Sequence, residues 1–308
     1  MAPQTQHEPK VSVVIPVYND SGRLTRCLEA LDRQTYRRDR YEVIVVDNGS
    51  EDAAAVEALA GRFGAIFSWE STPGSYAARN RGISVATGEV IAFTDADCIP
   101  AADWIERGVS CLQRHPDCGL VAGNIELFFQ NPDRLTPVEL FEKVTAFTQR
   151  QFVEGDRYGA TANLFVRRSI FDRVGNFRVG LKSSGDREWG QRVHSFGYPL
   201  VYASDVRVSH PARSTFGELY ARTRRIAGGF YDLHVRDRPS SWERDRAFAG
   251  AMLTHLIPPL MFVWNALGDR QLKDARDKLQ VCRAMFFFRY VSALEILRLR
   301  LGRRSARA

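Results

Sequence analysis

Four short apolar runs near the start of the chain alternate with segments that have helical spacing. The runs are VSVVIPVY (11–18), YEVIVVD (41–47), AIFSW (65–69) and VIAFTD (90–95), and they are rich in Val, Ile and aromatic residues. Runs this short and continuous are typical of strands that are covered on both faces. Strands that alternate with helices predict a parallel sheet with right-handed crossovers. We therefore expect an α/β fold with a Rossmann-like, mostly parallel sheet flanked by helices.

The segment between the first two runs has the periodicity of an amphipathic helix. Leu24, Leu28 and Leu31 fall on one helical face, and an Asp-Ser pair directly before them can supply the N-cap. The segment 51–64 has similar spacing and ends in a glycine, which favours a second helix there.

Acidic or amide side chains follow three of the four runs. The first run ends in PVYND and the second in DNGSED, and the fourth leads into DADCIP. A fold of this kind binds its ligands at the carboxyl ends of its strands. Neither a G-x-G-x-x-G nor a G-x-x-x-x-G-K-[ST] motif is present, so dinucleotide and P-loop sites are not indicated. An edge that offers carboxylates instead of amides predicts that a ligand's phosphates are met through a metal ion.

After about residue 118 the pattern changes to mixed elements. No linker rich in Pro, Gly or Ser divides this half from the first. We therefore expect one domain over residues 11–235, with halves at 11–117 and 118–235. A disordered N-terminus (1–10) would precede it, and a helical, apolar and basic extension (236–308) would follow.

The cysteines and the N-terminus bear on the cellular compartment. The five cysteines have no C-x-x-C or zinc-like spacing, which fits a reducing cytosol. Cys98, beside two aspartates, is interpreted as a small buried apolar residue in preference to a soft metal ligand. The first ten residues, MAPQTQHEPK, lack an apolar core, so we expect no signal peptide.

The formal net charge of +7 is concentrated at the C-terminal end. From Arg283 onward there are seven arginines and one acid, Glu295, so this segment contributes +6. A nucleic-acid binder would spread its positive charge over a working face, so we expect no nucleic-acid partner. A basic end segment instead favours attachment to an anionic surface.

Two apolar stretches precede and overlap that basic end. Residues 247–267 contain no Asp, Glu, Lys or Arg, and a second run, AMFFFRYVSALEIL, carries one Arg and one Glu. Two apolar helices with a basic end predict interfacial attachment to anionic lipid on the cytoplasmic face of the plasma membrane. The alternatives are two ordinary helices that pack on the preceding domain, or an interface that forms a homo-oligomer.

Six motifs occur in one order between residue 11 and about residue 211. They are VSVVIPVYND, VIVVDNGSED, AARNRGISVATGEVIAFTDAD, GATANLFVRRSIFDRVGNF, SGDREWGQRVHSFGY and the later Ser-His pair. Together they resemble the family 2 inverting glycosyltransferases of bacterial type, which have the A-type nucleotide-sugar transferase fold. The Q-x-x-R-W motif of the processive members is absent, so the resemblance implies transfer of one sugar per encounter.

The resemblance implies two groups of donor-binding residues. In its terms residues 11–117 form the donor half of the domain and residues 118–235 the acceptor half. At the strand ends the nucleotide-binding set is Pro16, Tyr18, Asp20 and Asp47. A carboxylate at Asp47 can accept the N3–H of uracil, although a turn with an N-cap is the alternative for the same residue. Family members often have Glu where this chain has Asp20, which leaves its role open.

The A-R-N-x-G motif supplies the second donor-binding group. Arg79 and Asn80 correspond to its polar positions, and Arg79 can meet diphosphate oxygens or an acidic neighbour. The alternative for Arg79 is an arginine on the solvated face of a helix.

Asp95 and Asp97 match the family's D-x-D motif. In an extended segment residues i and i+2 point the same way, so both carboxylates would face one ligand. Two bare carboxylates so placed repel each other, and Mg²⁺ or Mn²⁺ would remove that conflict. The resemblance implies that Asp97 binds the metal directly while Asp95 also touches the sugar or ribose. His210 corresponds to a family histidine that completes the metal shell, and a structural role is its alternative.

The general base is expected at the start of a later helix. Family members carry an acidic pair there, and this chain has Gly185 followed by Asp186. We expect Asp186 to take the proton of the acceptor hydroxyl, with Glu188 as the second candidate. A helix cap is the alternative for Asp186.

The function predicted from the sequence is therefore metal-dependent, inverting hexosyl transfer. The donor would be a nucleotide sugar, most simply a UDP-sugar, and the acceptor a hydroxyl of a glycan or lipid-linked glycan in polysaccharide biosynthesis. A sugar-phosphate nucleotidyltransferase is an alternative, but it would need a Gly-rich loop where this chain has PVYNDSGR. A catalytically inactive, membrane-associated sugar-binding scaffold is another, and it predicts loss of the acidic residues that this chain retains.

Overall fold

The computed structural model describes residues 8–269 and 271–303. Most of the N-terminal segment expected to be disordered, and the last five residues of the basic end, therefore lie outside the described residues. Packing divides the chain into two units. The first unit comprises residues 1–126, 147–180 and 186–210, and the second comprises residues 127–146, 181–185 and 211–308.

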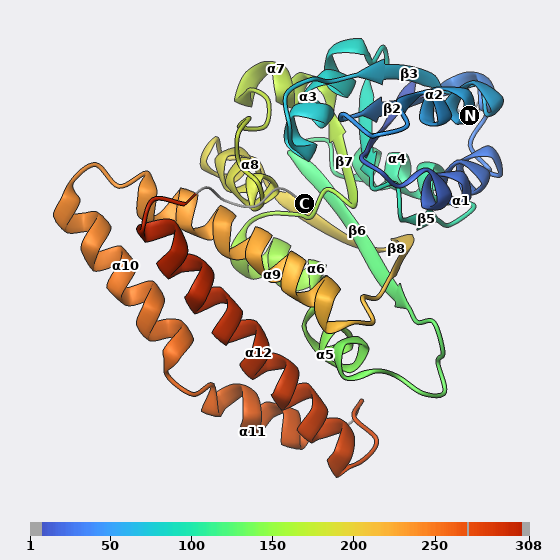
Figure 1. The fold of residues 1–308 in the computed structure, drawn as a ribbon. Helices are drawn as coiled ribbons and strands as arrows, with labels where there is room; N and C mark the ends of the chain where they lie inside the picture. Colours follow the sequence, from blue (N-terminus) through green and yellow to red (C-terminus); the bar gives the residue numbers. More distant parts are fainter. Residues whose placement is uncertain (1–7, 270, 304–308) are drawn as a thin grey trace. The chain divides into compact units, whose positions relative to one another are not determined.

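A mixed β-sheet forms the centre of the first unit (Figure 1). Its strands are β1 (Val11–Val17), β2 (Tyr41–Asp47), β3 (Ile66–Trp69), β4 (Val90–Thr94), β5 (Ile99–Pro100), β6 (Leu120–Phe128), β7 (Asn163–Arg167) and β8 (Leu200–Pro211). Within the described residues the eight strands lie in the order β3-β2-β1-β4-β7-β6-β8-β5. The first four are parallel to one another, β7 is antiparallel to β4 and to β6, and β5 is antiparallel to β8.

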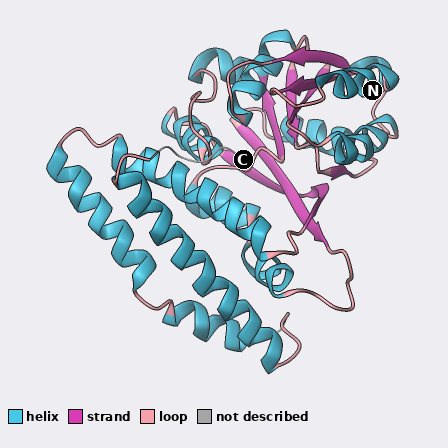
Figure 2. Cartoon of the chain, in the orientation of Figure 1, coloured by secondary structure: helices cyan, strands magenta, loops and turns pink. Residues whose placement is uncertain are grey.

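Helices cover both faces of this sheet (Figure 2). They are α1 (Ser21–Asp32), α2 (Ala53–Arg62), α3 (Ser75–Val85), α4 (Trp104–Arg114), α6 (Gln149–Gln151), α7 (Arg168–Val174) and α8 (Gly185–Ser195), with a π-helix at Phe152–Asp156. Val13 and Ile15 of β1 share one apolar cluster with buried residues of α1, α2 and α4. Val14 points to the other face, where α3 lies against it. The alternation of side chains along β1 thus assigns helices to the two faces.

The sequence predicted these strands and the first two helices well. All four apolar runs are strands, and Leu24, Leu28 and Leu31 form the buried face of α1. Asp20 is the N-cap residue of α1, as expected, although its side chain makes no capping hydrogen bond and pairs with Arg23 at 3.2 Å. One expectation was wrong. The strand β3 is not covered on both faces, because it lies at the edge of the sheet and leaves Trp69 56% exposed.

The segment PVELFEKVTAFTQRQF (137–152) does not form one continuous helix. It forms α5 (Pro137–Thr145), which ends before Phe147, a residue with φ of 51°. A left-handed residue cannot continue a right-handed helix, so the chain restarts at α6. The side chain of Gln149 then binds the backbone of Gly123 and Ala160, which holds this restart inside the first unit.

The second unit is helical. Besides α5 it contains α9 (Phe216–Tyr231), α10 (Ser241–Leu256), α11 (Leu260–Gly268) and α12 (Ala275–Arg300), with a π-helix at Asp232–Arg236. Two apolar clusters hold it together, one between α5, α9, α11 and α12 and the other between α9, α10 and α12. The helix α9, which precedes residue 236, therefore packs with the C-terminal helices.

A continuous apolar surface lies on α10 and α11, and we call it the apolar face. Its seven residues are each between 53% and 75% exposed: Leu253, Leu256, Ile257, Leu260, Met261, Trp264 and Leu267. The stretch Ser241–Gly268 is long and apolar enough to cross a membrane by length and composition, and 6% of its most apolar window is buried. The helix is interrupted at Pro258-Pro259, between α10 and α11.

The close packing of α3 on β1 gives a test of this fold. A Cβ atom added at Gly82 would lie 2.3 Å from Cγ1 of Val14, which is fully buried. We expect Gly82→Ala to lower the free energy of unfolding by ~1–3 kcal/mol, because the buried valine cannot move aside without strain. Urea denaturation would measure this.

Gly61→Ala is the matched control for that variant. Gly61 is also helical, in α2, but a Cβ atom there would meet nothing within 4 Å. The control should therefore be neutral or stabilising by ~0.5–1 kcal/mol. Equal effects of the two substitutions would contradict the packing of α3 on β1.

Candidate active site

Helix α3 places a buried arginine behind the carboxyl end of β4. The Arg79 residue is 4% exposed, and its guanidinium forms an ion pair with Oδ1 of Asp95, the first residue after β4. The guanidinium also lies over the ring of Tyr76, 5.6 Å from the ring centre, one turn earlier on the same helix. The Nε atom of Arg79 is buried without a hydrogen-bond partner. The structure therefore gives Arg79 an acidic neighbour, one of the two contacts expected for it.

Asp186 lies near this arginine, at the second residue of α8. Its Oδ1 accepts hydrogen bonds from the hydroxyl of Tyr76 at 3.2 Å and from the backbone N–H of Arg187 at 2.9 Å. Within residues 8–269 and 271–303 no hydrogen bond to Oδ2 is found, and this oxygen is not among the buried atoms that lack a partner. One carboxylate oxygen is thus fixed, and the other is available to a ligand.

Burial raises the pKa of the Asp186 carboxyl above its ordinary value. Arg79 and the hydrogen bonds from Arg187 and Tyr76 act in the opposite direction, because they favour the charged form. The negative charge of Asp95 adds a small upward effect. The loss of solvation outweighs the partners, so Asp186 is a stronger base than an exposed aspartate.

The start of α8 is held by contacts that fix Asp186 in place. Trp189 is fully buried, stacks on Phe171 with 4.7 Å between ring centres and donates its indole N–H to the carbonyl of Gly175. Arg192 forms a two-point ion pair with Glu188, at 3.1 and 3.2 Å, and donates to the carbonyls of residues 174 and 176. The structure therefore places Glu188, the second candidate base, in a contact that holds the helix.

Asn80 ties the loop before α8 to α3. Its side chain accepts a hydrogen bond from the backbone N–H of Phe177 at 3.0 Å and donates one to the carbonyl of the same residue at 2.8 Å. This two-point contact joins segments 97 residues apart in the chain. In this structure Asn80, expected to contact the donor, is engaged with the backbone.

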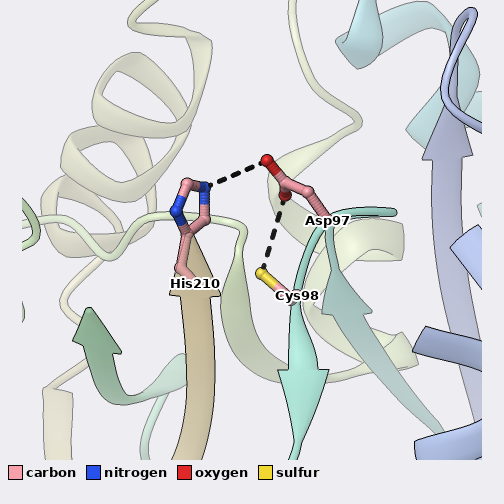
Figure 3. A group of neighbouring side chains, drawn as sticks. All are labelled: Asp97, Cys98 and His210. Atoms are coloured by element: carbon pink, nitrogen blue, oxygen red, sulfur yellow. Dashed lines mark hydrogen bonds and ion pairs between the residues drawn. The ribbon is translucent and has the colours of Figure 1, made fainter. Parts of the chain in front are cut away.

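A second polar group lies where β4 turns into β5 (Figure 3). The Nε2 atom of His210 is 3.3 Å from Oδ2 of Asp97, and the thiol of Cys98 is 4.0 Å from Oδ1 of the same aspartate. The register of the sheet explains this proximity, because β5 pairs with β8 through Ile99 opposite Ser209. One step further along that antiparallel pair sets Cys98 across from His210.

The donor atoms of Asp97, Cys98 and His210 all lie within 4.8 Å of one another. A carboxylate and an imidazole in this arrangement fit a divalent cation such as Mn²⁺ or Mg²⁺. Burial raises the pKa of the Cys98 thiol well above its usual range, so the thiol stays protonated and is a poor ligand for a hard cation. The residues that fit a metal are therefore Asp97 and His210.

The two aspartates of the D-x-D motif do not face the same way. The sequence analysis placed them in an extended segment, but residues 96 and 97 form a turn closed by a hydrogen bond from the N–H of Cys98 to the carbonyl of Asp95. The expectation of extended geometry was wrong. The turn directs Asp95 to Arg79 and Asp97 to His210. The two negative charges therefore point apart, and each aspartate has a partner of its own.

The ends of β1 and β2 form the expected edge beside this group. Asp47 is fully buried, its Oδ2 accepts from the backbone N–H groups of Gly49 and Ser50, and its Oδ1 has no hydrogen-bond partner. Asn48 binds the backbone at residues 70, 72 and 74, which positions the start of α3. The turn expected of Asp47 is present, and one carboxylate oxygen remains unmatched.

The other residues predicted at this edge are more open to solvent. Pro16 lies in β1 and is half-buried, and Tyr18 just beyond it is 40% exposed. Asp20 contacts Arg23, as described above. Tyr18 and Asp20 thus follow β1, which lies beside β2 and pairs with it up to Asp47.

Tyr76 is the site residue that the sequence analysis missed. It was not singled out because an aromatic residue in a helix is more often part of the core. A signal was present, since Tyr76 lies three residues before Arg79 and hence on the same helical face. The sequence alone could not show that Asp186 would lie against that face.

The comparison with protein families gives one match. The model of Glycosyl transferase family 2 matches residues 12–184, which is more than half of the chain. The matched stretch contains both aspartates of the D-x-D motif and ends two residues before Asp186.

Curated relatives carry related descriptions. The chain is 39% identical over 238 residues to the glycosyltransferase AglE of Haloferax volcanii, covering 75% of this chain and 76% of that protein. It is 30% identical over 210 residues to the putative glycosyltransferase EpsH of Bacillus subtilis, covering 63% and 58% of the two chains.

Among solved structures, the mannosyltransferase PcManGT of Pyrobaculum calidifontis, in complex with GDP-Man and Mn²⁺, has a TM-score of 0.61 at 21% identity. The alignment covers 95% of this chain and 88% of that one. TarS of S. aureus has a TM-score of 0.52 at 20% identity, with coverage of 92% and 55%. These likenesses support the A-type fold.

The raised pKa of Asp186 gives a test that needs no ligand. A carboxyl whose pKa is higher in the folded state stabilises the protein below its unfolded pKa, and this stability is lost as the pH rises through the folded pKa. We therefore expect Asp186→Asn, which is neutral at every pH, to raise the thermal midpoint at pH 7. The difference should disappear at a pH below the ordinary aspartate pKa. A variant that is less stable than the wild type at neutral pH would contradict the interpretation.

Proposed function

The chain belongs to glycosyl transferase family 2, and on that premise we propose that it is a metal-dependent, inverting glycosyltransferase. It would move one sugar from a nucleotide-sugar donor to a hydroxyl group of a glycan or lipid-linked acceptor. The observation that carries the proposal is the partly buried Asp186 carboxylate, whose Oδ1 accepts hydrogen bonds from Tyr76 and Arg187 and whose Oδ2 accepts none from the residues that the structure describes.

The proposed role of Asp186 is that of general base. Inversion at the anomeric carbon requires that the acceptor hydroxyl lose its proton as it attacks. Burial gives Asp186 the raised pKa that a base at neutral pH needs, and the bonds to Oδ1 orient the carboxylate. Arg79, beside it, supplies positive charge that favours the ionised form of the carboxylate. Oδ2 is the oxygen that would receive the proton.

The proposed metal ligands are Asp97 and His210, on the geometry of Figure 3. A bound Mn²⁺ or Mg²⁺ would supply positive charge for the departing diphosphate. Asp95 would serve the sugar or ribose, because its carboxylate is directed to Arg79 and is not part of the ligand group around His210. The mannosyltransferase of Pyrobaculum calidifontis was solved with Mn²⁺, which supports a divalent cation for this chain.

The proposed nucleotide-binding residue is Asp47. Its unmatched Oδ1 is buried, and a buried acceptor without a donor costs free energy that an N–H of a nucleobase would recover. Uracil offers one such N–H between two carbonyl groups, which favours a UDP-sugar. The structural neighbour bound to GDP-Man makes GDP-sugars the alternative to be tested beside it.

A donor panel tests the reaction and its metal. Purified protein with Mn²⁺ should release nucleoside diphosphate from a UDP-sugar or GDP-sugar when acceptor is supplied, and EDTA should stop the release. Asp97→Ala and His210→Ala should each lower the rate by ~10²-fold or more and weaken the binding of Mn²⁺, measured directly by electron paramagnetic resonance.

Asp186→Asn is expected to separate catalysis from metal binding. It should lower the rate by ~10²–10⁴-fold while the affinity for Mn²⁺ stays at the wild-type value, because the residue acts on the acceptor. Asp205→Asn is the control for the loss of one carboxylate in the first unit, because Asp205 is an exposed aspartate on β8. Release at the wild-type rate by Asp97→Ala would show that the metal assignment is wrong.

The apolar face of the second unit supports a proposal about location. Seven large apolar side chains on α10, α11 and the turn between them are exposed, and an exposed apolar area of this kind marks a surface for a partner or a membrane. Arg289 of α12 borders it, because its side chain donates to the carbonyls of residues 254 and 257 at the end of α10. We propose peripheral attachment to the cytoplasmic face of the plasma membrane, where anionic lipid and a lipid-linked acceptor would both be met.

Vesicle binding tests the attachment. The Trp264 residue is 75% exposed on α11, and its side chain should insert at the lipid interface. Trp264→Ser should weaken binding to vesicles of phosphatidylcholine and phosphatidylglycerol by ~10-fold, as measured by co-sedimentation. Trp69→Ser, which removes a 56% exposed tryptophan from the first unit, should leave it unchanged. Equal binding by all three proteins, with a change of oligomeric state in Trp264→Ser alone, would instead assign the apolar face to a contact between two copies.

A further inference from the structure

The second unit contains a largely covered arginine that makes no hydrogen bond. The side chain of Arg222, on α9, is 19% exposed, and its Nε lies 3.8 Å from Oε1 of Glu142. This distance is an ion pair but is too long for a hydrogen bond. In the described part of the chain no hydrogen bond from the Arg222 guanidinium is found, although this group carries five N–H donors.

The carboxylate beside Arg222 is already used by another arginine. Glu142, on α5, is fully buried, and Arg213 donates to both of its oxygens. The backbone N–H of Arg213 binds Oε2 and its Nη1 binds Oε1, each at 3.0 Å. One negative charge is thus shared between two guanidinium groups, and the better geometry belongs to Arg213.

The charge around Arg222 is therefore unbalanced. Burial lowers the pKa of Arg222 to about 10, and the positive charges of Arg213 and Arg225 add to this effect while Glu142 opposes it. Arg222 shares the charge of Glu142 with Arg213 and has no hydrogen-bonded anion of its own among the described residues.

A comparison within the same helix shows that this is a particular feature. Arg224 also lies on α9 beside a buried glutamate, Glu295, but it donates a hydrogen bond to that carboxylate at 2.9 Å. Arg298 completes the contact with two further hydrogen bonds. Glu295 therefore accepts hydrogen bonds from both of its arginines, whereas Glu142 accepts none from Arg222.

We propose that Arg222, supported by Arg213 and Arg225, is a binding site for a phosphate group. Phosphate and diphosphate groups present several acceptor oxygens that a guanidinium fork can bind at two points. They would supply both the negative charge and the hydrogen bonds that Arg222 lacks. The two sources of this chemistry near a nucleotide-sugar enzyme are a nucleoside diphosphate and the phosphate of a lipid. The site lies in the second unit and is separate in sequence from the metal ligands.

The test measures binding without turnover. Full-length protein in EDTA is titrated with inorganic pyrophosphate and, separately, with hexyl phosphate, so that a metal at Asp97 cannot hold the anion. Binding is followed by calorimetry and by the rise in thermal midpoint that a ligand of the folded state produces. We expect Arg222→Gln to weaken the dissociation constant by ~10-fold or more, and Arg222→Lys, which keeps the charge but not the fork, to weaken it less.

Arg276→Gln is the matched control, because Arg276 is exposed on α12 of the same unit. It should bind both probes as the wild type does. Arg222→Gln should fold normally, since Arg213 still pairs with Glu142, and thermal unfolding without the anion checks this.

The two probes distinguish the source of the phosphate. Tighter binding of pyrophosphate assigns the site to a nucleoside diphosphate, and tighter binding of hexyl phosphate assigns it to a lipid. Identical affinities in the wild type, Arg222→Gln and Arg276→Gln would mean an adventitious ion only and would overturn the proposal. Because no sugar is transferred in this experiment, its result is independent of whether the proposed reaction is correct.

Discussion

The buried ion pair between Arg79 and Asp95 is the contact around which the first unit's polar site is arranged. An arginine that is 4% exposed needs a carboxylate beside it, since a buried charge without a partner is strongly destabilising. The pair brings the end of β4 against α3, and Tyr76 on the same helix then reaches Asp186. The attraction of Arg79 lowers the pKa of Asp186, yet burial raises it by more. Asp95 is thus matched by a cation, whereas Asp186 has a raised pKa, which is the property that the proposed base requires.

A small number of contacts in the sheet and the loops hold the side chains of this site in place. Asn80 binds the loop before α8, and Arg192 binds both that loop and Glu188, so the start of α8 is fixed from two sides. The two-residue strand β5 has a similar effect at the other end of the site. Its pairing with β8 brings His210 to Asp97, although 113 positions separate them in the chain. A short strand therefore brings together the two residues that we propose as cation ligands.

The sequence predicted those features of the fold that follow from local patterns and from the position of strand ends. The strands β1, β2 and β4, the buried face of α1, and the polar edge with Asp47 follow from periodicity and from the rule that ligands bind at strand carboxyl ends. It did not predict the turn at residues 95–97 or the break before Phe147. Both depend on a backbone conformation that no side-chain pattern marks.

The contacts of the site were predictable only in part, for a related reason. The resemblance identified Asp97, Asp186 and His210 from the order of residue types in the sequence. It did not indicate which residue each of them contacts. That Asp95 turns to Arg79 while Asp97 turns to His210 is a property of the turn and of the sheet register. The engagement of Asn80 and Glu188 in holding α8 likewise depends on a loop whose path the sequence does not show.

The second unit shows why a count of charges along the chain is a poor guide to where charge acts. The sequence places the excess of arginine at the C-terminal end, but Arg298 and Arg300 there are paired with acidic side chains. Inside the unit, by contrast, Glu142 serves two arginines, and its weaker partner, Arg222, is nearly enclosed. Positive charge that is exposed can be screened by salt, whereas positive charge that is covered is screened much less and needs a specific anion beside it. The phosphate site that we propose therefore uses a covered arginine of α9, and not the arginines at the end of the chain.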